Sequence, residues 1–362
     1  MSDIVISGYY GLGNSGDEAL LKSIVSDLKS IDPDITITAL SANASLTKKV
    51  YGIKTVNRFN PFAIIKEFRN AKLLLSGGGT LIQDATSTKS LLYYLGIISL
   101  AKKMGLKVMV YANGMGPIRE KNVKRVNKVL NKTDLITLRE NVSLEEIKRC
   151  GITVPEVLVT ADPAFNIEAA DEDSIKNIFA KYSVEPDSKI VAVSVRECKN
   201  MPLDFEERMA EALDLIAARG YLPLFIPMQI SADLDISLRI ASRMKNMSKV
   251  IDSELQVSEM LALIGKCSIV CGMRLHMLIF ASVMNVPMAG IAYDPKIKGF
   301  MAYMNQETYV ELDSFDAEKF TAIAFSCLDN NEEMKKHLEE KSKPLRKKAK
   351  QNADLALGLL RK

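Results

Sequence analysis

Residues 4–18 read IVISGYYGLGNSGDE: β-branched apolar residues lead into a glycine-rich turn and then into the polar start of a helical pattern. This order of strand, turn and helix is the opening unit of a doubly wound α/β sheet. Gly11, Gly13 and Gly16 also match the G-x-G-x-x-G spacing of dinucleotide-binding folds. The next expected strand, residues 35–40, ends without the acidic residue that would bind a ribose, which argues against a dehydrogenase.

Helix-start signals overlap this turn. Ser15 and Glu18 form the S-x-x-E pattern of a capping box, in which each side chain accepts a hydrogen bond from the other residue's backbone amide. We therefore expect Ser15 to cap the helix and Glu18 to reach back to it. Asn14 and Asp17 are not required for this cap. They are either polar residues of the loop and first turn that the helix dipole favours, or residues that bind a ligand.

The alternation of strands and helices continues along the chain and then begins again at Lys189. Expected strands that are apolar throughout indicate a parallel sheet covered by helices on both faces. We therefore expect two doubly wound α/β domains, at residues 1–170 and 185–330. A helical segment at residues 331–362 should follow, with an interruption at Pro344.

The composition is that of a globular chain without a dominant charge. Its 362 residues carry 48 Lys and Arg against 44 Asp and Glu, and the net charge of +4 is too small to indicate nucleic-acid binding. Five cysteines supply no complete metal-ligand set, so we expect no metal. The first residues lack a signal-peptide pattern, which predicts a cytoplasmic protein. Basic stretches at 119–132 and 346–350 are either solvated faces or contacts for an anionic membrane surface.

Ligands of doubly wound sheets bind beyond the carboxyl ends of the strands, so we expect the functional residues there. Residues 76–80, Ser-Gly-Gly-Gly-Thr, follow one expected strand and either form a tight turn or allow a ligand to approach closely. Gln83 and Asp84 come next, and their side chains are candidates for binding sugar hydroxyls. Cationic side chains near other strand ends would together form an anion-binding site that draws on both domains: Arg139, Arg196, Arg274 and Lys296.

His276 is one of only two histidines, and it lies two residues after Arg274 at the start of an apolar helical pattern. The first turn of a helix presents free backbone amides and a positive dipole end, which favour a bound anion. An anion held there would favour the protonated imidazole, which can act as a general acid. The second histidine, His337, lies in a charged helical stretch and is expected to be inert.

Three motifs together resemble the polysaccharide pyruvyl transferases, and most closely the bacterial type that acts on secondary cell-wall polymers: residues 8–19, residues 76–79 and residues 272–276, Gly-Met-Arg-Leu-His. The resemblance implies a GT-B-like fold, with two Rossmann-type domains that face a cleft. It implies transfer of pyruvate from phosphoenolpyruvate onto a sugar as a cyclic ketal, with release of phosphate and without a cofactor. For the cell-wall (S-layer) type it implies a lipid-linked acceptor that carries β-N-acetylmannosamine, at the inner face of the membrane.

The resemblance also implies roles for the candidate residues. Phosphoenolpyruvate would be bound by a cationic set in which His276 is also the acid: Arg139, Arg196, Arg274, His276 and Lys296. Asp17 is the candidate base. The acceptor sugar would be bound on the N-terminal domain by Asn14, Asp17, Gln83 and Asp84.

Two other functions fit the same residues. A GT-B glycosyltransferase would use the cationic site to hold the diphosphate of a nucleotide sugar. A non-catalytic protein would bind an anion or a sugar without releasing phosphate. Each makes a different prediction about which ligand stabilises the protein and whether phosphate appears.

Overall fold

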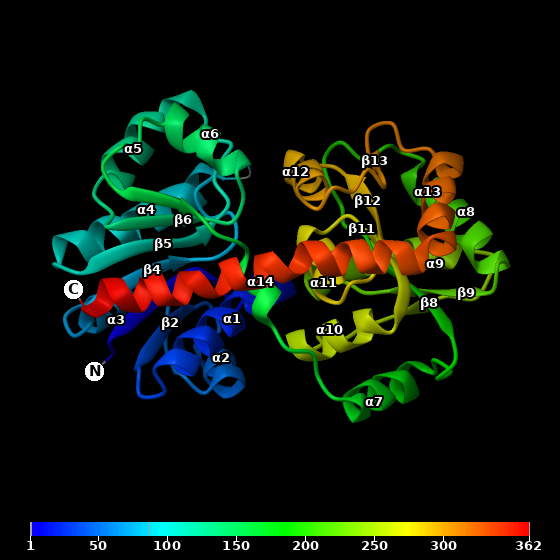
Figure 1. Cartoon of the computed structure of the whole chain (residues 1–362), viewed down its shortest axis with the longest axis horizontal. Coiled ribbons are helices and arrows are strands. Elements are labelled where there is room, and N and C mark those ends of the chain that lie inside the picture. The colour runs from blue at the N-terminus through cyan, green and yellow to red at the C-terminus, as the bar shows by residue number, and fades with distance from the viewer. Residues whose placement is uncertain (1, 86, 362) are drawn as a thin grey trace. The chain divides into compact units, whose positions relative to one another are not determined.

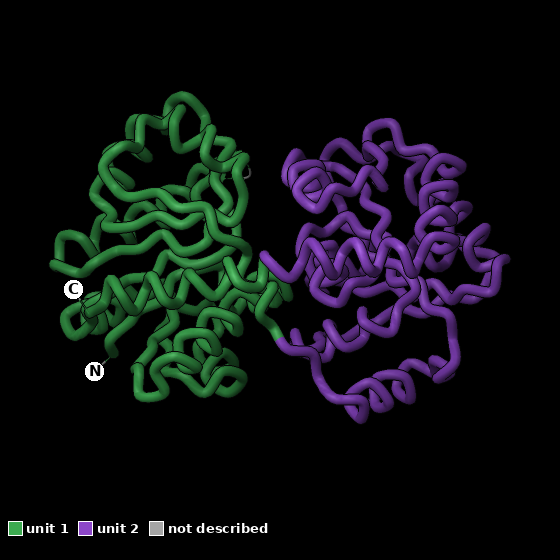
Figure 2. The backbone as a smooth tube through the Cα atoms, viewed as in Figure 1, with its two compact units in different colours: residues 1–167, 345–362 green, residues 168–344 purple. Residues whose placement is uncertain are grey.

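Alternating strands and helices build two separate parallel sheets in the computed structural model, which describes residues 2–85 and 87–361 (Figure 1). Each sheet is the centre of its own compact unit. Unit 1 is Met1–Ile167 together with Leu345–Lys362, and unit 2 is Glu168–Pro344 (Figure 2). The helix α7 (Glu172–Tyr182) lies in the segment that joins the two alternating series.

In unit 1 the described strands form a seven-stranded parallel sheet in the order β3-β2-β1-β4-β5-β6-β7. Its strands are β1 (Ile4–Tyr10), β2 (Ile37–Ser41), β3 (Lys54–Asn57), β4 (Leu73–Gly77), β5 (Lys107–Asn113), β6 (Leu135–Leu138) and β7 (Glu156–Val159). The chain runs outward from β1 to β3 and then returns to place β4 on the other side of β1. The loops that follow β1 and β4 are therefore neighbours at the carboxyl edge of this sheet.

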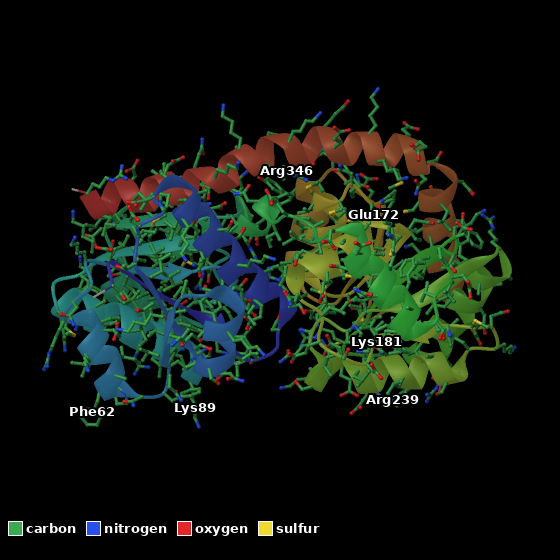
Figure 3. All side chains as sticks on the ribbon, turned by 90° about the horizontal axis from the view of Figure 1, so that it is seen from below. Phe62, Lys89, Glu172, Lys181, Arg239 and Arg346 are labelled. Atoms are coloured by element: carbon green, nitrogen blue, oxygen red, sulfur yellow. The ribbon has the colours of Figure 1, made fainter. Side chains whose placement is uncertain are left out.

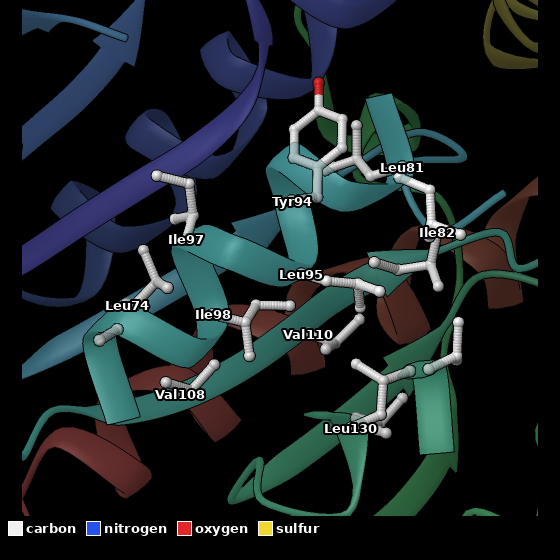
Figure 4. Packing of buried hydrophobic residues seen from close by; sticks show 14 of the residues in the cluster. Leu74, Leu81, Ile82, Tyr94, Leu95, Ile97, Ile98, Val108, Val110 and Leu130 are labelled. Carbon is white, nitrogen blue, oxygen red and sulfur yellow. The ribbon is translucent and has the colours of Figure 1, made fainter. Parts of the chain in front are cut away.

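Helices cover both faces of this sheet: α1 (Ser15–Ile31), α2 (Ala44–Tyr51), α3 (Pro61–Phe68), α4 (Thr88–Lys103), α5 (Glu120–Leu130), α6 (Val142–Arg149) and the short 3₁₀ helix η1 (Pro163–Asn166). Helix α4 illustrates how the core forms. Leu95 and Ile98 lie about one turn apart on α4 and are buried next to Val110 and Val108 of β5, and the neighbouring Tyr94 is buried as well (Figure 4). This packing fixes the strands whose carboxyl ends carry the polar residues.

Unit 2 repeats the arrangement with six described strands in the order β10-β9-β8-β11-β12-β13. They are β8 (Lys189–Ser194), β9 (Tyr221–Phe225), β10 (Lys249–Val250), β11 (Cys267–Gly272), β12 (Met288–Ala292) and β13 (Tyr309–Glu311). Its further helices are α8 (Phe205–Ala218), α9 (Ile230–Arg243), α10 (Val257–Gly265), α11 (Leu275–Val283), α12 (Pro295–Tyr303) and α13 (Ala317–Asp329). The prediction of two doubly wound parallel sheets is confirmed.

The last helix, α14 (Asn331–Arg361), is continuous through Pro344, so the expected interruption there is wrong. Tertiary contacts on both sides of the proline outweigh its low helix propensity. Ser342 donates to the Asn285 side chain at 3.1 Å within unit 2, and Asn352 bonds to Thr160 at 2.8 Å within unit 1. No helix among the described residues has the length and apolar character that crossing a bilayer requires.

Asp27 in helix α1 makes unit 1 sensitive to pH. Its side chain is buried, and its Oδ2 accepts a hydrogen bond from Asn166 at 2.8 Å, while the buried Oδ1 of Asn166 has no hydrogen-bond partner among the described residues. Burial raises the pKa of Asp27 from its ordinary 3.8 to about 6. The folded protein therefore holds a proton that the unfolded chain releases between these values, and stability falls as the pH rises through this window.

Replacing Asp27 by asparagine should remove this cost and supply an amide donor for Asn166. We expect the variant to be more stable than the wild type at pH 7 by roughly 1–3 kcal/mol. The gain should fade toward pH 4, where the wild-type carboxyl is already protonated. Thermal unfolding of both proteins at pH 4 and pH 7 measures the difference, with Asp34→Asn on the exposed surface as the control. An equal gain at both pH values would contradict the explanation.

Candidate functional site

The carboxyl ends of three adjacent strands in unit 2 carry the predicted cations. Strand β11 lies between β8 and β12, with Gly272 of β11 beside Ser194 of β8 and Gly290 of β12. Each of these strands is followed within four residues by one predicted cation, namely Arg196 after β8, Arg274 after β11 and Lys296 after β12. The prediction that these positions lie at strand ends is therefore confirmed for this sheet.

Arg274 is held in place by a buried carboxylate. It lies just before α11 as the N-cap residue, and its side chain forms a two-pronged ion pair with Asp233 of α9. Arg274 Nε donates to Asp233 Oδ2 at 2.9 Å, and Nη2 donates to Oδ1. The Asp233 carboxylate is completely buried and also accepts from the amide of Gln229. This pairing fixes the plane of the guanidinium and leaves Nη1 as the nitrogen without a hydrogen-bond partner among the described residues.

A tyrosine brings the other two cations together. The Arg196 guanidinium lies 5.1 Å and the Lys296 ammonium 5.6 Å from the centroid of the Tyr293 ring. Arg196 Nη1 also donates to the Tyr293 hydroxyl at 3.1 Å. Lys296 is further paired with Asp294 at 3.5 Å, and the Asp294 side chain accepts from the Lys296 amide as the N-cap of α12. Cation–π contacts therefore gather two positive groups at one point of the carboxyl edge.

His276 is the second residue of α11 and is partly exposed, next to the tethered Arg274. Its ring centroid is 6.3 Å from that of Phe280, one turn further along the helix. The structure thus places the imidazole at the N-terminal turn of a helix, as the sequence predicted. An anion bound at this turn would experience the helix dipole, the free amides and the neighbouring arginine.

The glycine-rich turn of unit 1 differs from the expected capping box. Asn14, not Ser15, is the N-cap of α1, and its Oδ1 accepts from the Gly16 amide at 3.0 Å. Glu18 does not reach back to Ser15: its Oε1 accepts from the Gly11 amide at 2.7 Å, and its Oε2 accepts from the Tyr51 hydroxyl at 2.8 Å. Both Asn and Ser are good N-caps, and the Glu18 carboxylate is occupied by the Gly11 amide and the Tyr51 hydroxyl.

Asp17 lies beside the second glycine-rich loop. Its Oδ1 would be 3.1 Å from a Cβ atom added to Gly79. Gly78 and Gly79 have φ values of +74° and +72°, a left-handed conformation that side chains rarely adopt, and a Cβ at Gly78 would clash with Leu20 at 2.8 Å. Glycine is therefore needed here for the backbone turn and for the close approach of α1.

Asp84 is fully buried inside unit 1. Its Oδ1 accepts from the Arg119 amide at 2.8 Å and its Oδ2 from the Asn122 side chain at 2.5 Å, so the carboxylate holds the start of α5. Gln83, next to it, is partly exposed. Of these two predicted sugar-binding residues, Gln83 is the more accessible to a ligand.

Arg139 follows β6 of unit 1 and is also buried. Its Nη1 donates to Asp162 at 2.8 Å, its Nε to Glu140 at 3.1 Å and its Nη2 to Thr80 at 3.1 Å. Burial lowers the pKa of Arg139, but Glu140 and Asp162 outweigh this effect and leave it above its ordinary value. All three nitrogens that can donate are engaged within unit 1. Its two acidic partners more than balance its single positive charge.

Sequence reasoning missed the residues that hold the cations. Asp233 lies forty-one positions before Arg274, on a helix that the residue pattern did not reveal, and no spacing links the two. Tyr293 ends a predicted strand, but a tyrosine at a strand end is not by itself a signal for cation binding. An acidic residue in an otherwise apolar helical face would have been the available clue for Asp233, since such a residue needs a buried partner.

A family model described as polysaccharide pyruvyl transferase matches residues 14–295 of the chain. The chain belongs to this family. The match begins within the first glycine-rich turn, at Asn14, and includes the second glycine-rich loop and all the predicted cations except Lys296, which lies one residue beyond it. The resemblance to the polysaccharide pyruvyl transferase family is therefore confirmed.

A curated relative supports membership of the pyruvyl transferase family. The amylovoran biosynthesis protein AmsJ of Erwinia amylovora is 24% identical over 396 residues, covering 92% of this chain and 94% of that protein. Together with the family match, it supports a transferase that acts in polysaccharide biosynthesis.

Solved structures show the fold of this pyruvyl transferase family member. A glycosyltransferase from Rickettsia africae has a TM-score of 0.61 at 14% identity, covering 99% of this chain and 96% of its own. The UDP-GlcNAc 2-epimerase from Neisseria meningitidis has a TM-score of 0.65 at 11% identity, with coverages of 98% and 100%. The wall teichoic acid polymerase TagF has a TM-score of 0.63 at 15% identity, with coverages of 99% and 88%. The expected GT-B-like fold is confirmed.

Proposed function

We propose that this family member transfers the pyruvyl group of phosphoenolpyruvate onto two hydroxyls of a sugar. Protonation of the methylene carbon C3 gives a methyl group and a cationic C2 that the adjacent oxygen stabilises. One sugar hydroxyl attacks C2 and loses its proton. A second hydroxyl then displaces the phosphate from C2 and gives its proton to it, so that inorganic phosphate leaves and the ring closes as a ketal.

The observation that carries the proposal is the set of three cations on adjacent strand ends of unit 2. Phosphoenolpyruvate has a carboxylate and a phosphate, so it requires several positive groups in fixed positions. Arg274 is oriented by Asp233, while Arg196 and Lys296 are gathered on Tyr293. Pre-oriented guanidinium groups bind such anions more strongly than mobile surface charges do, because less side-chain freedom is lost on binding.

We assign to His276 the role of the acid that protonates C3 of phosphoenolpyruvate. Asp17 would be the base that accepts the proton of the attacking hydroxyl. His276 follows the tethered arginine on the first turn of α11, where a bound anion favours the imidazolium form. Asp17 is a partly exposed carboxylate on the first turn of α1 in unit 1, beside Gly79. Arg139, whose guanidinium is engaged by Asp162, Glu140 and Thr80, would order the loop after β4 rather than grip the donor.

The proposed acceptor is a lipid-linked saccharide with a β-N-acetylmannosamine unit, bound from unit 1 by Asn14, Asp17 and Gln83. A lipid carrier would bring the protein to the inner face of the cell membrane. The basic stretches 119–132 and 346–350 have exposed Lys and Arg side chains that suit anionic headgroups.

Phosphate release tests the proposal directly. The purified protein should release inorganic phosphate from phosphoenolpyruvate only when an acceptor is present, here a panel of water-soluble synthetic glycosides. The product should gain the mass of a ketal-linked pyruvyl group. Thermal stabilisation by a nucleoside diphosphate without phosphate release would instead favour a nucleotide-sugar glycosyltransferase. Stabilisation by phosphoenolpyruvate without turnover on any acceptor would favour a binding protein.

A further inference from the structure

The outer edge of the unit 1 sheet presents an unusual surface. Strand β3 is the last strand on this side, and two helices pack against it. Helix α3 contributes Ile64 and Phe68 to the core on one face of the sheet, whereas Tyr51 at the end of α2 packs with the core on the other face. We call the exposed side chains of these two helices and of the turn before α3 the edge surface: Leu46, Lys48, Lys49, Val50, Phe59, Phe62, Lys66 and Arg69.

Two phenylalanines dominate the edge surface. Phe62 is 84% exposed and Phe59 68% exposed, although phenylalanine is normally among the most buried residue types. Phe62 projects away from the ribbon of α3 in Figure 3. Leu46 and Val50 lie one turn apart on α2 and are about half exposed. Contact between this many apolar side chains and water is unfavourable in free energy. A binding partner that covered them would remove this unfavourable contact.

The charges of the edge surface have one sign. Within residues 44–72, all of which the structure describes, the exposed charged residues are Lys or Arg, and the single acidic residue, Glu67, is buried. Phe62, Lys66 and Arg69 have the spacing i, i+4, i+7 and share one face of α3. Four of the basic residues have no ion pair within the described chain: Lys48, Lys49, Lys66 and Arg69.

Hydrogen bonds fix the turn that carries the phenylalanines. The Phe59 amide donates to the Asn57 side chain at 2.8 Å, and Asn60 caps α3 by accepting from the Ala63 amide at 3.1 Å. Beneath it, the buried Arg58 donates to the Gly8 carbonyl at 2.9 Å and lies 5.5 Å from the Phe59 ring centroid. Hydrogen bonds therefore fix the backbone that carries both rings, and Arg58 contacts the Phe59 ring.

We propose that the edge surface binds an anionic phospholipid bilayer, with Phe59 and Phe62 inserted at the level of the headgroups and upper acyl chains. Exposed aromatic rings flanked by lysine and arginine are the features of proteins that lie in a membrane interface. The proposal rests on the proposed function in one respect: membrane binding would bring the protein to a lipid-linked acceptor. The edge surface differs from the basic stretch 119–132. That stretch has exposed basic side chains, but within it the structure describes no exposed large apolar side chain.

Charge argues for a membrane over a second copy of this chain. In a two-fold symmetric dimer the same surface would face itself and bring the unpaired lysines and arginines of both copies together. A bilayer with anionic lipids supplies the opposite charge together with an apolar layer for the rings.

Vesicle flotation of the full chain tests the proposal. Binding should be strong to phosphatidylcholine vesicles that contain phosphatidylglycerol and weak to phosphatidylcholine alone. The double variant Phe59→Ser/Phe62→Ser should bind anionic vesicles at least about tenfold more weakly, because each ring loses its apolar burial. The matched control is Val154→Ser/Leu203→Ser, which removes two apolar side chains elsewhere that are as a pair at least as exposed as the phenylalanines and should bind like the wild type. Lys66→Glu/Arg69→Glu should weaken binding most at low salt.

Three results would overturn the proposal. The first is a wild-type protein that binds neither kind of vesicle. The second is loss of binding with Lys121→Glu/Lys124→Glu but not with the phenylalanine variant. The third is a wild-type dimer, measured by light scattering, that the phenylalanine variant turns into a monomer. Phosphate release with a water-soluble acceptor, measured in parallel, should be the same in the wild type and the phenylalanine variant, so failure of the membrane proposal is separate from failure of the proposed function.

Discussion

His276→Asn is expected to lower kcat for phosphate release roughly 10²–10⁴-fold, the contribution typical of a general acid. Asparagine keeps a polar group of similar reach but cannot deliver a proton to C3 of phosphoenolpyruvate. The donor KM should change much less than kcat, since Arg196, Arg274 and Lys296 remain. Steady-state kinetics at saturating acceptor measure both constants, and thermal unfolding checks that the variant is folded.

His337→Asn is the matched control, because this histidine contacts the Met304 carbonyl at 3.2 Å, lies on α14 and is not among the candidate site residues. It should turn over like the wild type. If His276→Asn retains kcat within a few-fold of the wild type, His276 is not the acid. A rise in donor KM alone would make it a binding residue.

The largest effect on donor use is expected when the ion pair of Arg274 with Asp233 is replaced. Arg274→Ala alone would leave the fully buried Asp233 without its cation, and breaking a buried pair in this way costs about 3–5 kcal/mol of folding stability. That variant would confuse loss of fold with loss of binding. The double variant Arg274→Gln/Asp233→Asn keeps two amides that can bond to each other and removes both charges.

In this double variant we expect kcat/KM for phosphoenolpyruvate to fall by roughly ten- to more than a hundredfold, which corresponds to the 1.5–3 kcal/mol of a hydrogen bond to a charged group. The KM for acceptor should stay near the wild-type value, and the unfolding temperature should exceed that of Arg274→Ala. Asp233→Asn alone, which retains the arginine but loosens its orientation, should give an intermediate donor KM. An unchanged donor KM in the double variant would remove Arg274 from the donor site.

Much of the fold could be predicted from the sequence because each long strand and helix has its own spacing of apolar residues. Buried strands such as Ile4–Tyr10 are runs of mostly apolar residues, whereas the helices between them have apolar residues three or four positions apart. The alternation of these two patterns can be followed along the chain. Short edge strands escaped prediction: Lys54–Asn57 has a half-exposed pattern and Lys249–Val250 has only two residues. Such strands depend on pairing with a neighbour rather than on their own side chains.

The candidate site was predictable in position but not in its connections. Arg196, Arg274 and Lys296 could be placed at strand ends because a parallel sheet brings those ends to one edge. Their partners come from elsewhere in the chain, as with Asp233 on α9, and local spacing carries no information about such contacts. The N-cap of α1 shows the same limit, since Asn14 caps the helix in place of Ser15, and Glu18 is bonded to Tyr51, thirty-three residues away in the sequence.

Helix α14 has a consequence for how the protein is made. Its final turns supply Ala353, Ala356 and Leu357 to the same core as Ile4 and Leu28, although these groups lie at opposite termini. A nascent chain leaves the ribosome from its N-terminus at about 5–20 residues per second. Part of the apolar face of the first sheet to emerge must therefore stay uncovered until residues 353–357 have been translated, by which point the later sheet already has all its strands.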